Sequence, residues 1–136
     1  MFSIYIRRTA ELHGLTACRP VYEQAINVLN QDGCREMCLR YAELEMKIGE
    51  IDRSRAIFAH CANICNPDVH VTFWDKWKDF ETEHGNEDTI REMLRVKRQV
   101  AATHNTQVIF DEFCSSKFHT KILGQLHGGC YVGSKC

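Results

Sequence analysis

Cysteine and histidine are the side chains in this sequence whose spacing could support metal or redox chemistry. Cys34 and Cys38 stand four residues apart, and Cys61 and Cys65 repeat that spacing. Residues four apart share one face of a helix, so each pair could present two thiols together. Zinc needs four converging ligands in a tetrahedral arrangement, and His70 lies close in sequence. A zinc site is therefore one interpretation of this segment.

The same cysteines also fit the apolar positions of a helical core. Cys61 and Cys65 follow Ala25 and Leu29 at a step of 36 residues, and the latter pair belongs to an apolar stripe. Because buried cysteine behaves as a small apolar side chain, we expect these thiols to pack in a core. We expect no metal and no cofactor. The cysteines also lack the spacing of a disulfide scaffold, which predicts reduced thiols.

A repeat of 36 residues organises most of the chain. Arg19, Arg55 and Arg91 follow one another at steps of 36, and a large apolar residue stands three positions after each. Self-similarity at this period indicates a helical solenoid, in which each pair of helices buries its apolar stripe against the next pair. The residues that we expect to pack between helices are Tyr22, Tyr41, Leu44, Phe58, Trp77, Phe80 and Leu94.

The repeats predict an all-α fold, an α–α superhelix of about two and a half helical hairpins. A partial repeat spans residues 1–30, and two further repeats span 33–65 and 68–104, which gives a repeat domain over 1–105. An apolar cluster at the start of the chain has no visible covering repeat, so we expect a fragment of a longer array or a partner there. Residues 106–136 hold four of the eight glycines and break the register. They are expected to form a divergent, partly disordered tail.

Opposite charges recur at a fixed separation across the predicted hairpin turns. Glu45 and Arg55 are ten residues apart, and so are Glu81 and Arg91. We predict an ion pair within each hairpin. Such a pair is worth at most about 1 kcal/mol where it is exposed.

Trp74 and three basic residues of the predicted last helix could touch a partner or RNA. Trp74 lies off the main apolar stripe, whereas Arg95, Lys97 and Arg98 make one side of the last helix basic. Basic residues can contact phosphates, but a terminal helix also needs a solvated face. A net charge of −1 gives no global signature of a nucleic-acid binder. Direct RNA binding is therefore the alternative function.

Catalytic patterns are missing from the sequence. It has no phosphate-binding glycine loop, no paired-histidine zinc helix and no serine elbow. We therefore predict no enzyme, no catalytic residue and no small-molecule substrate. No apolar run has the length of a membrane-spanning helix, so we expect no membrane partner.

The repeat motifs resemble a known family. Two motifs share an aromatic residue, an apolar residue and a glutamate: Tyr41-x-x-Leu44-Glu45 and Trp77-x-x-Phe80-Glu81. They resemble the half-a-tetratricopeptide (HAT) repeat of RNA-processing scaffolds. Residues 35–40 and 84–94 resemble, more narrowly, the last HAT repeats of the splicing-factor family called Syf-one in yeast and XPA-binding protein two in animals. The resemblance runs from Met1 to about Phe110.

This resemblance implies several properties that the repeat alone does not. It implies a protein-binding scaffold segment of the spliceosome, located in the nucleus. The implied partners are proteins of the nineteen complex, with RNA contacted at most indirectly. In animals the family also has a link to transcription-coupled repair, and its full chains are several times longer.

Overall fold

The computed structural model describes the backbone of residues 1–133 and the side chains of residues 1–111. Within this described part the chain forms helices and no strand. The elements are α1 (Phe2–His13), the short 3-10 helix η1 (Leu15–Cys18), α2 (Arg19–Val28), α3 (Gln31–Ile48), α4 (Ile51–Ala62), α5 (Val71–His84) and α6 (Glu87–Gly133). The predicted all-α class is confirmed.

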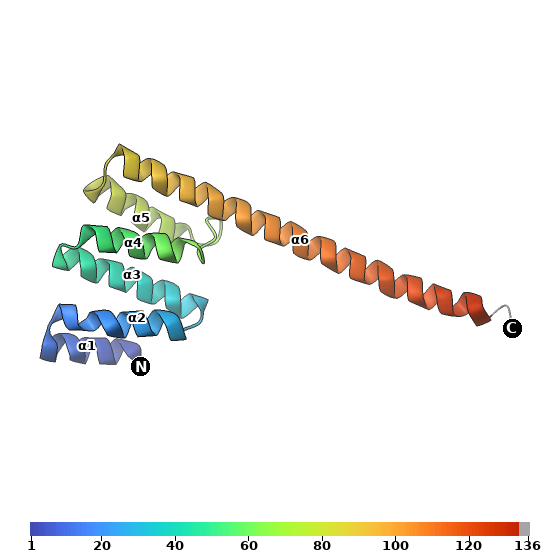
Figure 1. Cartoon of the computed structure of the whole chain (residues 1–136), viewed down its shortest axis with the longest axis horizontal. Helices are drawn as coiled ribbons and strands as arrows, with labels where there is room; N and C mark the ends of the chain where they lie inside the picture. Colours follow the sequence, from blue (N-terminus) through green and yellow to red (C-terminus); the bar gives the residue numbers. More distant parts are fainter. Residues whose placement is uncertain (134–136) are drawn as a thin grey trace. The chain divides into compact units, whose positions relative to one another are not determined.

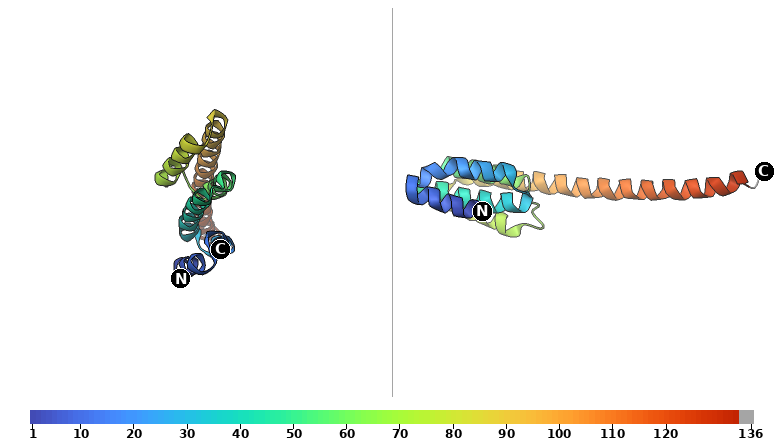
Figure 2. Two further views of the ribbon diagram at one scale, coloured as in Figure 1. Left: turned by 90° about the vertical axis from the view of Figure 1, so that its left-hand side faces the viewer. Right: turned by 90° about the horizontal axis from the view of Figure 1, so that it is seen from below.

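The helices from α1 to α5 lie side by side in chain order and alternate in direction, as Figure 1 and Figure 2 both show. They belong to one compact unit, Met1–Ala101, which also includes the first part of α6. Short turns join α1 to α2 through η1, α3 to α4, and α5 to α6. These three hairpins correspond to the repeats expected from the sequence.

Local chemistry explains where α3 begins and ends. Asn30 precedes the helix, and its side chain accepts a hydrogen bond from the backbone N–H of Gly33 at 3.0 Å, which is an N-terminal cap. Gly49 follows the helix with φ of 96°, a left-handed conformation that glycine adopts without steric cost. Its N–H donates to the carbonyls of Glu45 and Met46. The chain can therefore turn directly into α4.

Gly85 ends α5 for a different reason. Its φ of −99° is open to any residue, so conformational freedom does not require glycine there. A Cβ atom at this position would collide with Oγ1 of Thr89 and with the carboxylate of Glu81. Glycine is needed because the buried Glu81 side chain passes close to the backbone.

The core consists of two apolar clusters that follow one another along the stack. The first gathers residues of α1 to α3, namely Ile6, Cys18, Val21, Tyr22, Ala25, Met37, Tyr41 and Leu44. The second runs from α3 to α6 and includes Cys34, Cys38, Ala42, Phe58, Cys61, Ala62, Cys65, Phe73, Trp74, Trp77, Phe80, Met93 and Val100. The helices between α1 and α6 thus bury residues against both of their neighbours, as a repeat array requires.

The segment predicted as a tail belongs to α6. The backbone is helical as far as Gly133, beyond Leu126, where the helical stripe in the sequence ends. Residues 134–136 and the side chains of 112–136 lie outside the described residues, and the predicted partial disorder of the tail concerns mainly these. A second compact unit begins at Ala102.

Candidate protein-interaction surface

A charged clamp joins the second and third repeats. The guanidinium of Arg55 on α4 donates from Nε to both carboxylate oxygens of Glu81 on α5, at 2.9 and 3.2 Å. Glu81 is 1% exposed, and it also accepts a hydrogen bond from Nε1 of Trp77 at 3.2 Å. Charge-assisted bonds of this kind satisfy a carboxylate that has been removed from water.

The same clamp recurs one repeat earlier. Arg19 on α2 holds Glu45 on α3 in a bidentate arrangement, with Nε to Oε1 at 2.7 Å and Nη2 to Oε2 at 2.8 Å. Glu45 has no exposed surface. The hydrogen bonds that Arg19 donates to Glu45, together with the negative charge of that carboxylate, raise the pKa of Arg19 above its ordinary value. Both clamps link residues that are 26 positions apart.

The predicted ion pairs within the hairpins are therefore wrong. Glu45 pairs with Arg19 and not with Arg55, and Glu81 pairs with Arg55 and not with Arg91. Arg91 instead pairs with Glu87 on its own helix. The arginines and the glutamates both repeat at 36 residues, so a spacing of 26 is as regular as a spacing of ten. Only the packing of one repeat on the next distinguishes them.

Aromatic rings stack beside each clamp. Tyr22 and Tyr41 lie with ring centroids 5.1 Å apart and an interplanar angle of 3°, and Phe58 and Trp77 with centroids 6.1 Å apart and an angle of 6°. Phe80 packs against Phe58 at 5.2 Å. These five residues and Leu44 are buried, so six of the seven predicted packing positions do pack in the core.

Leu94 is the exception, and its predicted role is wrong within this chain. The side chain is 43% exposed, whereas its neighbour Met93 is 2% exposed and packs in the core. Leu94 occupies the position of Tyr22 and Phe58, which face the following repeat. No further hairpin follows α6 in the described part of the chain, so this face is not covered.

Four cysteines, two on α3, one on α4 and one just after α4, form one thiol cluster in the core. Cys34, Cys38, Cys61 and Cys65 are all buried, and Sγ of Cys61 lies 3.6 Å from Sγ of Cys65. Hydrogen bonds to Cys38 and Cys65 raise the pKa of Cys61, and burial raises the pKa of Cys34 to about 11. The expectation that these thiols pack as apolar residues is confirmed.

Metal ligands do not converge in the described residues. No group of three or more histidine, cysteine or carboxylate side chains there has an arrangement that could hold a metal ion. His70 has a buried Nδ1 atom without a hydrogen-bond partner, at the start of α5. No helix of the described part is long and apolar enough to cross a membrane.

Trp74 is not available to a partner, contrary to the prediction. It is 1% exposed, and its Nε1 donates to the backbone oxygen of Cys65 at 3.0 Å. The ammonium of Lys97 lies 5.9 Å from the Trp74 ring, which is a cation–π contact. Lys97 therefore covers the core edge, whereas Arg95 and Arg98 remain exposed on α6, and Arg95 pairs with Glu92.

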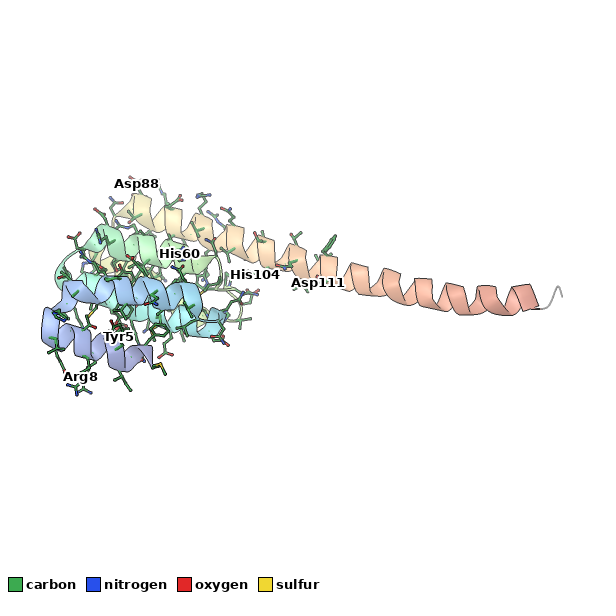
Figure 3. The ribbon with its side chains drawn as sticks, turned by 60° about the horizontal axis from the view of Figure 1, so that its bottom comes forward. Tyr5, Arg8, His60, Asp88, His104 and Asp111 are labelled. Atoms are coloured by element: carbon green, nitrogen blue, oxygen red, sulfur yellow. The ribbon has the colours of Figure 1, made fainter. Side chains whose placement is uncertain are left out.

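A groove of about 370 Å³ lies between α2 and α4, over α3. Ile26, Ala56 and Ile57 supply apolar walls, and the Tyr41 hydroxyl at its floor donates to Oε1 of Glu23 at 3.3 Å. His60, labelled in Figure 3, lines it from α4. We call this the first groove; its full lining is Glu23, Ile26, Asn27, Tyr41, Arg53, Ala56, Ile57 and His60.

An equivalent groove of about 310 Å³ lies one repeat further on, between α4 and α6. We call it the second groove, and it is lined by Asp52, Arg55, Ala56, Ala59, Trp77, Glu81, Thr89, Glu92, Met93 and Val96. Trp77 and Met93 replace Tyr41 and Ile57 at a step of 36 residues. Ala56 lines both grooves, because α4 is the ridge between them. A small exposed alanine on the outer face of α4 was the signal that sequence reasoning missed.

The first helix exposes the face that later repeats bury. Ile4, Tyr5 and Leu12 are 71%, 58% and 74% exposed. Tyr5 occupies the repeat position of Tyr41, which stacks on the preceding repeat. Arg8 points away from the neighbouring helix in Figure 3. The apolar cluster expected at the start of the chain is thus exposed on α1.

The stacked hairpins, their aromatic seams and the two grooves define the class: a helical-repeat protein of the HAT type. A family model described as Pre-mRNA-splicing factor Syf1/CRNKL1 C-terminal HAT repeat matches residues 1–125. The chain belongs to this family, which is not catalytic. The family similarity extends past Phe110, where the sequence motifs ended.

Curated relatives carry the same family name. The chain is 59% identical over 110 residues to the pre-mRNA-splicing factor SYF1 of Rattus norvegicus and 58% identical over 110 residues to that of Homo sapiens. The syf1 homolog of Drosophila melanogaster is 55% identical over 108 residues. These alignments cover 81% of this chain for the mammalian proteins and 79% for the fly protein. The chain spans only 13% of the mammalian proteins and 12% of the fly protein.

Proposed function

We propose that this chain is a protein-binding segment of a pre-mRNA splicing scaffold, acting in the nucleus by presenting helical surfaces to other spliceosomal proteins. The partners are proteins of the nineteen complex, and RNA is contacted at most through them. Relatives named pre-mRNA-splicing factor SYF1 support the pathway. A role in transcription-coupled repair belongs to the same proposal, through the same protein contacts.

The recurrence of one groove at the period of the repeat carries the proposal. Each groove has an aromatic ring at its floor and aliphatic walls from two consecutive second helices. Concave, mostly apolar surfaces with a few polar groups at their edge are typical of sites that bind protein segments. Array proteins use such periodic surfaces to hold extended partners.

Direct RNA binding is the second candidate, and exposed Arg95 and Arg98 on α6 favour it. Against it, Arg95 already pairs with Glu92 on the same helix. The aromatic half of the predicted RNA surface is also lost, because Trp74 is buried. Stacking on bases needs an exposed ring.

A single substitution in the ridge between the grooves tests the proposal. Ala56→Arg places a long charged side chain in both grooves without altering the core, because Ala56 is exposed. The full chain is used as bait in nuclear extract, and bound nineteen-complex proteins are detected with antibodies. We expect recovery with the natural sequence and a loss of about tenfold or more with Ala56→Arg.

Ala102→Arg is the matched control, since it adds the same charge at an exposed helical alanine that lines neither groove. It should leave recovery unchanged. Treatment of the extract with ribonuclease separates the two functions. Recovery that survives ribonuclease supports protein binding, whereas recovery that disappears with the RNA would make RNA binding the correct function.

A further inference from the structure

The two repeat boundaries share one recognition pattern. On the second helix of a repeat, an arginine and a ring stand three residues apart; on the first helix of the next repeat, a ring and a glutamate stand four residues apart. The matched sets are Arg19 and Tyr22 with Tyr41 and Glu45, and Arg55 and Phe58 with Trp77 and Glu81. The second helix therefore recognises an aromatic residue and a carboxylate on one helical face.

The last helix carries the arginine of this pattern, with a leucine in the position of the ring. Arg91 and Leu94 stand 36 residues after Arg55 and Phe58. By the same register, their partners would be Phe113 and Lys117. Both positions belong to α6, the helix that also carries Arg91 and Leu94, and its backbone runs from Glu87 to Gly133. Lys117 also has the wrong charge to replace a glutamate.

The receiving face is exposed and carries three arginines, two of which pair with carboxylates of the same helix. Side chains of Arg91 and Leu94 are 69% and 43% exposed, and Arg91 makes ion pairs with Glu87 and with Asp88, the latter at 4.0 Å. Arg95 and Arg98 flank them, at the positions where α4 has Ala59 and Ala62. Exposed ion pairs within one helix are weak, so Arg91 can exchange them for a carboxylate that is buried by a partner.

We propose that the α6 face formed by Arg91, Leu94, Arg95 and Arg98 binds an acidic helix of a partner protein, one that carries an aromatic residue and a carboxylate four positions apart. The inference rests on the proposed protein-binding function and names the chemistry of one partner. Charge complementarity requires the acidic side chains. Leu94 in the centre favours an aromatic ring over a phosphate, since it offers apolar contact and no hydrogen bond.

The probe is a stapled helical peptide with the sequence of residues 71–84, which contains Trp77 and Glu81 at the required spacing. Its binding to the full chain is measured by fluorescence anisotropy. We expect Arg91→Glu to weaken binding about tenfold or more, and the peptide bearing Glu81→Arg to lose affinity for the natural chain equally. The Arg91→Glu chain and the Glu81→Arg peptide together should recover most of the affinity.

Arg7→Glu is the control, because Arg7 is an exposed arginine paired with Glu11 on its own helix, as Arg91 is with Glu87. It should bind the peptide as the natural chain does. Unchanged affinity of Arg91→Glu would overturn the inference, and so would failure of the charge-swapped pair to recover. Displacement of the peptide by single-stranded RNA at lower concentration than by unlabelled peptide would also overturn it.

The result is independent of the groove experiment. If Arg91→Glu has no effect while nineteen-complex proteins are still recovered through Ala56, this inference fails and the proposed function stands. If recovery is absent but the charge swap restores peptide binding, the proposed function fails and the acidic-helix surface stands.

Discussion

Arg55 on α4 crosses the boundary between two repeats and holds the buried carboxylate of Glu81 on α5, with its Nε 2.9 Å from Oε1. The guanidinium is 27% exposed and the carboxylate 1%. The pair thus lies at the edge of the core, where water screens it only from one side. We therefore expect this clamp to stabilise the fold more than an exposed surface ion pair does.

Arg55→Ala should lower the free energy of unfolding by about 2–4 kcal/mol, because it leaves the Glu81 carboxylate buried with the Trp77 indole N–H as its remaining donor. Urea unfolding followed by circular dichroism measures the change. Arg95→Ala, which breaks the exposed pair with Glu92, should cost less than about 1 kcal/mol. In double-mutant cycles, Arg55 should couple to Glu81 by more than about 1 kcal/mol; a larger coupling of Glu81 to Arg91 would contradict the observed pairing.

Truncation of two adjacent residues on α6 should lower the stability by very different amounts. Met93→Ala removes a fully packed side chain, and we expect a loss of about 2–4 kcal/mol in the free energy of unfolding. Leu94→Ala should change it by less than about 1 kcal/mol, since Leu94 is largely exposed. The same urea titration compares the two variants. Equal losses would mean that α6 is rotated on α5.

The thiol cluster should be unreactive in the folded protein. Cys18, Cys34, Cys38, Cys61 and Cys65 are buried free cysteines, and reaction with a disulfide reagent requires an exposed thiolate. The assay uses a chain in which Cys114, Cys130 and Cys136 are replaced by serine, so that only these five contribute. We expect no colour from Ellman's reagent in buffer and full reaction in guanidinium chloride. Rapid reaction in buffer would show that the cluster opens.

Alkaline pH should destabilise the packing of Tyr41 on Tyr22. Burial, together with the carboxylates of Glu23 and Glu45, raises the pKa of Tyr41 to about 12. An unfolded tyrosine ionises near pH 10, so the unfolded state releases this proton first. The neutral Tyr41 side chain therefore contributes roughly 2–3 kcal/mol to the free energy of unfolding below about pH 10. This contribution is lost as the pH rises to about 12. Tyr41→Phe should lose less stability over this range; parallel profiles would refute the assignment.

The repeat in the sequence predicted most of the fold. Apolar stripes at helical spacing that recur at a fixed period indicate helices stacked in chain order. Tyr22, Tyr41, Phe58 and Trp77 were placed correctly by that argument alone. The partners of Glu45 and Glu81 were not, because two spacings, ten and 26, are equally periodic in the sequence. The structure is needed to choose between the two spacings, because it shows which arginine packs next to each glutamate.

The binding surface was harder to predict than the core. Trp74 was a possible partner contact because it lies off the main stripe, but it is buried between the backbone of Cys65 and the Lys97 side chain of α6. The grooves were missed because a groove has no motif of its own. Small residues such as Ala56 and Ala59 on the outside of a helix leave room for a groove. The apolar stripe used to predict the core does not include such exposed positions.

Each clamp joins the second helix of one repeat to the first helix of the next repeat. The clamps therefore cross the boundaries of the sequence repeats. A chain truncated after Cys65 would lack α5, so Arg55 and Phe58 would lose their contacts with that helix. A chain truncated after Gly85 would keep these contacts. The unit joined by a clamp is therefore offset by one helix from the unit that recurs in the sequence. Exchange of segments between related arrays would keep both residues of each clamp in one piece where the crossover follows a first helix, and would separate them where the crossover follows a second.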